Sequence, residues 1–366
     1  MMNIKSEISN DDNNAIKQLN SKFESIAFDF GDGDNGNFLS GWQCDNPFVK
    51  EFILSVQKNS LQFDSTKYSY YDTYTDLLNS IHFFHKNLDN KQPESIICGC
   101  GSTSLLSTFA AYLASAGITR VYYISPLYIT LHTALHRYKI ETIPISDKHP
   151  YENDFTINLP KVRKAFLLMT DPIWIAGIPI HKSHIEEISK WQNDFEATIF
   201  IDGSLQYMPW NNNRYELTSS LNPSLTIRLV CPSKQLCIHG YRFSYMLVPS
   251  NISRKLNWTY TSLFGPAPVD SISFGQKAIH ALIEGEIPKK LSHFIKNRFE
   301  LLISEQAVEP FVIPECGYFM FAKVLKKLPE NYLLIDGSFF AKNNLSEYSK
   351  LNLLSPSITI LTSKIN

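Results

Sequence analysis

Stretches of strand length alternate with stretches of helix length through residues 90–250, and this alternation limits the fold more than any other feature of the chain. Glu94–Cys98 has the composition of a buried strand, and a glycine turn then opens an apolar helix over Ser104–Ala116. Six further strands are expected here: Arg120–Ile124, Ile140–Ile145, Ala165–Met169, Thr198–Ile201, Thr226–Val230 and Phe243–Val248. The alternation predicts an α/β fold with a mostly parallel seven-stranded sheet sandwiched by helices.

The pattern changes near Leu256, which indicates a smaller second domain. Two helices and two short strands are expected there: Ile272–Ile283, Pro288–Leu302, Tyr318–Val324 and Ile358–Leu361. With 366 residues, of which 44% are hydrophobic, the chain can bury both cores. We therefore expect an N-terminal arm over 1–45, a large ligand-binding domain over 46–258 and a small α+β domain over 259–366.

Lys234 and Arg242 follow the strand Thr226–Val230 and carry the strongest chemical signal. Lysine can form a Schiff base with an aldehyde cofactor, and arginine can bind a phosphate through two parallel hydrogen bonds. Gly240 leaves room for a close approach to Arg242. The pair suggests pyridoxal phosphate; a solvated lysine and a surface salt bridge of the arginine are the plain alternatives.

Two further features lie where ligand groups gather in a parallel sheet, at the carboxyl ends of strands. Asp202 follows the apolar run Thr198–Ile201, where a carboxylate is costly without a partner; alternatively, it caps the turn that follows. Gly101, Ser102 and Thr103 precede the first helix. Their amides and hydroxyls can hold a phosphate near the positive end of the helix dipole.

These landmarks occur in the order found in fold type I pyridoxal phosphate enzymes, and the chain resembles this family, especially its class I/II aminotransferases, from about Phe28 onward. The resemblance implies that Lys234 is the Schiff-base lysine and moves the proton at the substrate α-carbon. It implies that Asp202 pairs with the protonated pyridine nitrogen. It also implies a phosphate site formed by Gly101, Ser102, Thr103, Ser233 and Arg242.

The resemblance assigns cofactor contacts to two tyrosines as well. Tyr128 matches the aromatic residue that stacks on the cofactor ring, although a tyrosine of the core has the same sequence pattern. Tyr68 matches the tyrosine that reaches the phosphate of the neighbouring subunit. That match implies a homodimer with shared active sites.

The chain departs from the family's pattern around the cofactor ring. Trp174 stands in place of the asparagine that bonds the ring hydroxyl, and we include it in the predicted cofactor site. Leu205 stands in place of the tyrosine that bonds the same oxygen. Either a nearby polar residue substitutes, with Asp171, Gln206 and Tyr207 as the candidates, or the chemistry is altered.

A further departure concerns the arginine with which relatives bind the substrate α-carboxylate. Thr359, in the expected strand Ile358–Leu361, is assigned to its position, and the last arginine of the chain is Arg298. We therefore expect that another cation binds the carboxylate or that the substrate has none there.

The resemblance implies an aminotransferase that acts on a small amino compound through an external aldimine. A lyase, cyclase or oxidase of specialised metabolism on the same cofactor is the alternative, and a non-catalytic protein that kept the scaffold is a third. A Lys234→Ala variant and a borohydride-sensitive absorption band would separate the enzymes from the third reading.

Composition excludes several other classes. The net charge of −1 gives no basic surface for nucleic acid or a membrane, and Met1–Ser25 lacks the apolar core of a secretory signal. We expect a cytoplasmic protein. The six cysteines have no paired CxxC spacing, so we expect free thiols, with neither a metal site nor disulfides.

Overall fold

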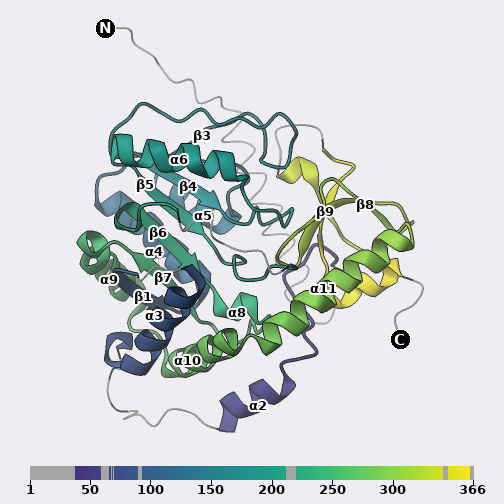
Figure 1. Ribbon diagram of the computed structural model, residues 1–366, viewed down its shortest axis with the longest axis horizontal. Coiled ribbons are helices and arrows are strands. Elements are labelled where there is room, and N and C mark those ends of the chain that lie inside the picture. Colours follow the sequence, from purple (N-terminus) through teal and green to yellow (C-terminus); the bar gives the residue numbers. More distant parts are fainter. Residues whose placement is uncertain are drawn as a thin grey trace.

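The computed structural model describes residues 38–58, 66, 68, 70–89, 93–211, 220–340 and 345–362 (Figure 1). Seven strands form the larger sheet, in the order β1-β7-β6-β5-β4-β2-β3. The neighbouring strands from β6 to β3 are all parallel, whereas β7 runs antiparallel to both β1 and β6. The bounds are β1 Ser95–Gly99, β2 Arg120–Tyr123, β3 Glu141–Pro144, β4 Phe166–Thr170, β5 Thr198–Asp202, β6 Thr226–Val230 and β7 Ser244–Val248.

Helices cover both faces of this sheet. Their bounds are α2 Lys50–Lys58, α3 Thr75–Asp89, α4 Gly101–Ser115, α5 Ile129–Arg137, α6 Lys182–Phe195, α8 Pro232–Gln235, α9 Ser250–Phe264, α10 Val269–Glu284 and α11 Glu286–Ser304. Successive residues of a strand point to opposite faces. Leu168 and Phe200 therefore pack with α4 and α5, while Leu167 and Ile199 pack with α6. This explains why the central strands are apolar throughout.

A smaller antiparallel sheet, in the order β10-β11-β9-β8, lies beside the first (Figure 1). Its bounds are β8 Val308–Pro310, β9 Phe319–Val324, β10 Ile335–Asp336 and β11 Ser349–Asn352. One hydrophobic cluster contains residues of both sheets, such as Ile199 and Phe321, together with residues of α11. The predicted fold class, a mostly parallel seven-stranded sheet with a smaller α+β part, is confirmed. The domain boundaries stay a prediction.

The segment 38–44 joins the smaller sheet although it lies near the start of the chain. Leu39 N donates to Leu333 O at 3.1 Å, and Asn352 N donates to Leu39 O at 2.8 Å. The Asn352 side chain also donates to Gly41 O at 3.1 Å and to Gln43 O at 2.8 Å. These bonds hold the segment beside β11, the last strand in the described part of the chain.

One predicted strand is wrong. Residues 358–361 belong to a 3₁₀ helix, η4 (Pro356–Leu361), and not to a strand. Pro356 favours the first turn of a helix, and the Ser355 side chain caps it by accepting a hydrogen bond from Ser357 N. Three shorter 3₁₀ helices are η1 Tyr71–Thr73, η2 Pro223–Leu225 and η3 Gly337–Phe339. No helix in the described ranges is both long and apolar enough to cross a membrane.

Candidate active site

A cavity lies where β4, β5 and β6 end, at the carboxyl edge of the larger sheet. Its empty volume is about 380 Å³, part of which is open to solvent. The residues that line it are Trp42, Tyr128, Thr170, Pro172, Trp174, Asp202, Ser204, Leu205, Lys234, Tyr318 and Phe319. Four of the predicted site residues therefore face one cavity: Tyr128, Trp174, Asp202 and Lys234.

Lys234 lies in α8, the short helix that follows β6, with its Nζ atom 4.6 Å from the centre of the Tyr128 ring. Burial lowers the pKa of this amine, but the charges of Tyr128 and Asp202 outweigh burial and raise the net pKa above its ordinary value. The positive charge of Arg242 opposes that rise. Tyr128 and Asp202 are therefore the neighbours that favour the protonated form of this amine.

Asp202 is the last residue of β5 and is only 6% exposed. Its Oδ1 accepts a hydrogen bond from Ser204 N at 3.1 Å. The aspartate therefore caps the following turn, as the plain alternative held, and also faces the cavity, as the functional prediction held. A buried carboxylate in this position needs a positive partner, and the charge of Lys234 supplies one.

Aromatic rings form one wall of the cavity. Trp42 Nε1 donates to the Tyr128 hydroxyl at 2.9 Å, and the Trp174 ring meets the Tyr128 ring edge-on at 5.3 Å between centres. Trp174 Nε1 donates to Pro126 O at 3.2 Å. Both indole N–H groups are thus bonded within the wall, and the rings offer the cavity flat apolar surfaces.

The residues proposed as substitutes for the lost ring-oxygen donors point elsewhere. Gln206 Nε2 donates to Asp171 Oδ2 at 3.0 Å, and Arg228 Nη2 donates to Gln206 Oε1 at 3.1 Å and to the Tyr207 hydroxyl at 2.5 Å. Within the described chain, Asp171, Gln206 and Tyr207 are absent from the cavity lining. Burial raises the pKa of Asp171 to about 6 although the N–H of Ile180 lowers it. This buried network supports the site from behind.

Two residues that line the cavity have buried hydroxyl groups without a partner in the described part of the chain. Thr170 Oγ1 and Ser204 Oγ are buried and have no hydrogen-bond partner among the residues that the structure describes. Both residues line the cavity, one at the end of β4 and the other two residues after Asp202. A buried hydroxyl without a partner costs free energy, so both groups are suited to bond a ligand atom.

A second cluster lies at the start of α4. Gly101 has φ +77°, a left-handed conformation that favours glycine, and a Cβ atom placed on it would lie 2.7 Å from Arg242 Nη2 and would push the guanidinium aside. Ser102 is buried and Thr103 is exposed. Within the described ranges, no side chain caps the first turn of α4, whose N–H groups can bind an anion. The structure therefore brings Gly101 and Arg242 together, as predicted.

The remaining two predicted residues lie differently. The Ser233 hydroxyl bonds the backbone of the segment after α8, donating to Phe243 O at 3.0 Å and accepting from Phe243 N at 3.0 Å. It is 1% exposed and positions the Lys234 turn. Tyr68 is 81% exposed and lies away from the cavity lining in this single chain.

The strand expected around Thr359 is wrong, because that residue lies in η4 and the last described strand is β11; the assignment of Thr359 to the position of the family's arginine stays a prediction. Lys350 of β11 is fully buried, with Nζ 3.3 Å from the centre of the Trp42 ring and 4.0 Å from that of Phe319. The described part of the chain offers this amine no hydrogen-bond acceptor. Burial, helped by the charge of Lys234, holds its pKa well below the ordinary value.

Sequence reasoning missed Thr170, Ser204, Tyr318 and Lys350. The first two had a usable signal, because each is a hydroxyl residue at or just after the carboxyl end of an apolar strand. Tyr318 comes directly before β9, and only the packing of the smaller sheet against the larger one brings it to the cavity. Lys350 of β11 lies behind the aromatic wall and is not among the lining residues.

Comparison with known proteins places the fold. Neither a family model nor a curated protein sequence matches the chain. Among solved structures, substrate-bound BacF from Bacillus subtilis superimposes with a TM-score of 0.76 at 12% identity, covering 93% of each chain.

Two further solved structures are similar over most of their length. The aminotransferase AspB from Helicobacter pylori has a TM-score of 0.72 at 15% identity, over 88% of this chain and 91% of that one. The aspartate aminotransferase from Thermotoga maritima has a TM-score of 0.72 at 15% identity, over 94% of each. The chain therefore has the fold of these aminotransferases, and the predicted resemblance is confirmed at the level of the fold.

Proposed function

We propose that the protein is a pyridoxal phosphate-dependent enzyme that transfers the amino group of a small amino compound. One observation carries the proposal: Lys234 and Asp202 face the same cavity, and the Tyr128 ring lies beside the lysine amine. The aminotransferases of the same fold support it. When bound, pyridoxal phosphate supplies an aldehyde that condenses with amines and a ring that withdraws electrons from the substrate α-carbon.

The residues present fit this cofactor. Asp202 is a buried carboxylate for the pyridinium nitrogen, and Thr170 and Ser204 are buried hydroxyls with a bond still to make. Arg242 against Gly101 is a cradle for the phosphate that an added Cβ atom would fill. We therefore assign the ring to the cavity and the phosphate to the start of α4, with Ser102 and Thr103 beside it.

The chain's own residues then have distinct tasks. Lys234, once it has lost its proton, would accept the proton of the substrate α-carbon and release a proton to the carbon that the cofactor aldehyde contributes, on the far side of the amino nitrogen. The Asp202 carboxylate would hold the ring nitrogen from the end of β5. Tyr128 holds the ring face, and the Trp174 indole, bonded to Pro126, keeps water from that side.

Lys350 is our candidate for the cation that receives a substrate carboxylate. Its amine lies behind the Trp42 ring, and Trp42, Trp174 and Phe319 separate it from the cavity. The Trp42 ring must therefore move aside before a carboxylate reaches Nζ. A carboxylate that arrives there supplies both the missing acceptor and the negative charge that favours protonation of the amine.

An absorbance experiment tests the cofactor. Wild-type protein mixed with pyridoxal phosphate should develop a visible band that survives dialysis and is bleached by borohydride, leaving the cofactor covalently on a peptide that contains Lys234. Lys234→Ala should show no such band, whereas Lys190→Ala, on the exposed face of α6, should match wild type. A wild-type protein without the band would contradict the proposal.

A second experiment tests the reaction. Donor amino acids and amines labelled at nitrogen are incubated with keto-acid acceptors, and the label is followed by mass spectrometry. Label in the acceptor-derived amino acid is expected. Ammonia, a cyclic product or oxygen uptake without label transfer would instead indicate a lyase, cyclase or oxidase on the same cofactor.

We further propose a cytoplasmic homodimer in which Tyr68 reaches the phosphate of the other subunit. The high exposure of Tyr68 supports this, because a residue that serves a partner must be free in its own chain. Mixing Tyr68→Phe with Lys234→Ala protein should restore part of the activity, since mixed dimers contain one intact site. No recovery in dimers shown to exchange subunits would refute the shared site.

A further inference from the structure

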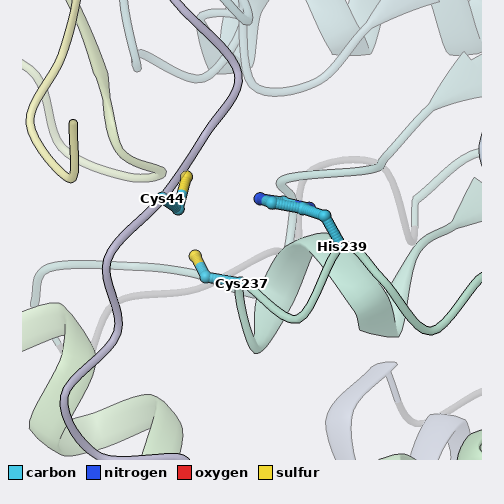
Figure 2. Close-up of side chains that lie close together, drawn as sticks. All are labelled: Cys44, Cys237 and His239. Atoms are coloured by element: carbon cyan, nitrogen blue, oxygen red, sulfur yellow. The ribbon is translucent and has the colours of Figure 1, made fainter. Parts of the chain in front are cut away.

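A cluster of two thiols and one imidazole lies next to the cavity and has no task in the proposed function. The nearest ligand atoms of Cys44, Cys237 and His239 all lie within 4.8 Å of one another. Figure 2 shows the three side chains converging from two segments, Cys44 from the coil segment before α2 and the other two from the loop after α8. The wide sequence separation explains why spacing alone did not predict a site.

The surroundings of the three side chains are those of ligands. Cys237 is 6% exposed, and His239 Nε2 is buried without a hydrogen-bond partner in the described part of the chain. Asn352 Nδ2 donates to Cys44 Sγ at 3.7 Å, the kind of contact that orients a ligating sulfur. A buried ring nitrogen close to two sulfurs, with no hydrogen bond of ordinary length in the described part of the chain, is suited to bind a metal ion together with them.

We propose that Cys44, Cys237 and His239 bind one Zn²⁺ ion. Two sulfurs and one imidazole suit zinc, whereas magnesium and calcium require oxygen ligands. In a tetrahedral zinc site the ligand atoms are roughly 3.5–3.8 Å apart, so the widest separation must close by about 1 Å. Both thiols lose a proton on binding, and the fourth position is left for water or a further ligand.

A zinc ion at this site would link two segments that border the candidate active site. Cys44 comes two residues after Trp42, and Cys237 Sγ lies 3.4 Å from the carbonyl oxygen of Lys234. Zinc at this place therefore ties the aromatic wall to the lysine turn. The zinc site does not depend on the proposed cofactor, because none of its ligands is assigned to the cofactor.

Zinc titration of the full-length protein tests the site. The protein is reduced, freed of metal with a chelator and titrated against a chromophoric zinc indicator. One equivalent of zinc should bind, and Co²⁺ in its place should give a thiolate-to-metal charge-transfer band. Cys44→Ser and Cys237→Ser should each weaken zinc binding by more than about 100-fold, since even the loss of an outer-shell partner costs about 10–100-fold.

Cys316→Ser is the matched control, because Cys316 is also buried and its sulfur donates to Gly177 O at 3.3 Å outside the cluster. It should bind zinc as wild type does. Circular dichroism checks the fold, and zinc should raise Tm only where all three ligands remain. Lys234→Ala should keep the metal, which separates this test from that of the cofactor.

Two results would overturn the zinc site. One is reduced wild-type protein that takes up less than a stoichiometric amount of zinc. This result counts against the site even if Cys44 and Cys237 were joined by a disulfide in the protein as isolated. The other is zinc uptake that survives in both Cys44→Ser and Cys237→Ser.

Discussion

Replacing Lys350 with methionine should make the protein more stable and the proposed substrate bind more weakly. The amine is fully buried, and the described residues give it no acceptor, so the fold bears the cost of an unsatisfied polar group. That cost is about 1–3 kcal/mol, and methionine removes it while keeping a chain of similar length. The free energy of unfolding of Lys350→Met should therefore rise by about 1–3 kcal/mol.

Binding should change in the opposite direction. A hydrogen bond between an ammonium ion and a carboxylate contributes about 1.5–3 kcal/mol. At about 1.36 kcal/mol for each factor of ten, its loss should raise KM for a carboxylate substrate by roughly 10- to 150-fold. An amine substrate without a carboxylate should be unaffected.

The pH dependence follows from the lowered pKa of Lys350. The folded state holds this proton less tightly than the unfolded state, so wild-type stability should rise with pH between the lowered pKa and the ordinary value near ~10.4. Lys350→Met should lack that rise. Carboxylate binding needs the protonated amine, so it should weaken as pH increases.

Urea unfolding and steady-state kinetics measure both effects, with Lys323→Met as the matched control. Lys323 lies in the neighbouring strand β9, is 39% exposed and pairs with Glu347 at 2.6 Å, so its loss should change stability by less than about 1 kcal/mol. A Lys350→Met variant that is less stable than wild type would show that the fold provides a favourable partner for the amine. An unchanged KM would show that the amine does not bind the substrate carboxylate.

Three further changes test the surroundings of the cavity. Wild-type stability should fall as pH rises from about 4 to 6.5, because a carboxyl whose pKa is raised from 3.8 to about 6 destabilises the fold by about 3 kcal/mol once ionised. Asp171→Asn should lack this fall. The same dependence of unfolding free energy on pH in variant and wild type, measured by urea unfolding, would refute this. Gly101→Ala should lower pyridoxal phosphate affinity at least about tenfold, because the added Cβ displaces Arg242, whose charged hydrogen bonds contribute about 1.5–3 kcal/mol, and the left-handed φ should separately lower stability by about 1–2 kcal/mol; Gly240→Ala, with open space around it, should match wild type in a fluorescence titration. Thr170→Val should raise stability by about 1 kcal/mol without cofactor and weaken cofactor binding about fivefold, since it removes a buried hydroxyl without a partner; calorimetry that finds both values unchanged would contradict the assigned bond.

The larger sheet was predictable because its strands are apolar on both faces. The expected strand Thr226–Val230 matches β6 to the residue, and Asp202 and Lys234 were found because each follows such a strand. Their shared cavity agrees with the prediction, whereas their roles stay predictions until tested. A single charged residue at the end of an apolar stretch can be recognised in a sequence as a candidate site residue, because burial of an unpaired charge is costly.

The smaller sheet was less predictable because its strands are short and carry polar residues. In β11, Ser349, Lys350 and Asn352 are all buried, so the strand lacks the apolar pattern that marks the others. The apolar run at 358–361 resembles a strand, but Pro356 and Ser355 start a 3₁₀ helix before it. The sequence therefore directed attention to the segment that forms η4, whereas the cation that we propose, Lys350, lies in β11.

The bonds between segment 38–44 and β11 have a consequence for the order of synthesis. The Ser40 hydroxyl donates to Lys350 O, and Asn352 Nδ2 donates to Gly41 O, joining residues 310 and 311 positions apart. A nascent chain can complete the larger sheet while β11 is still inside the ribosome. The segment that carries Trp42 must wait for β11, so in a partly translated chain only Tyr128 and Trp174 of the aromatic wall can lie beside Lys234 and Asp202.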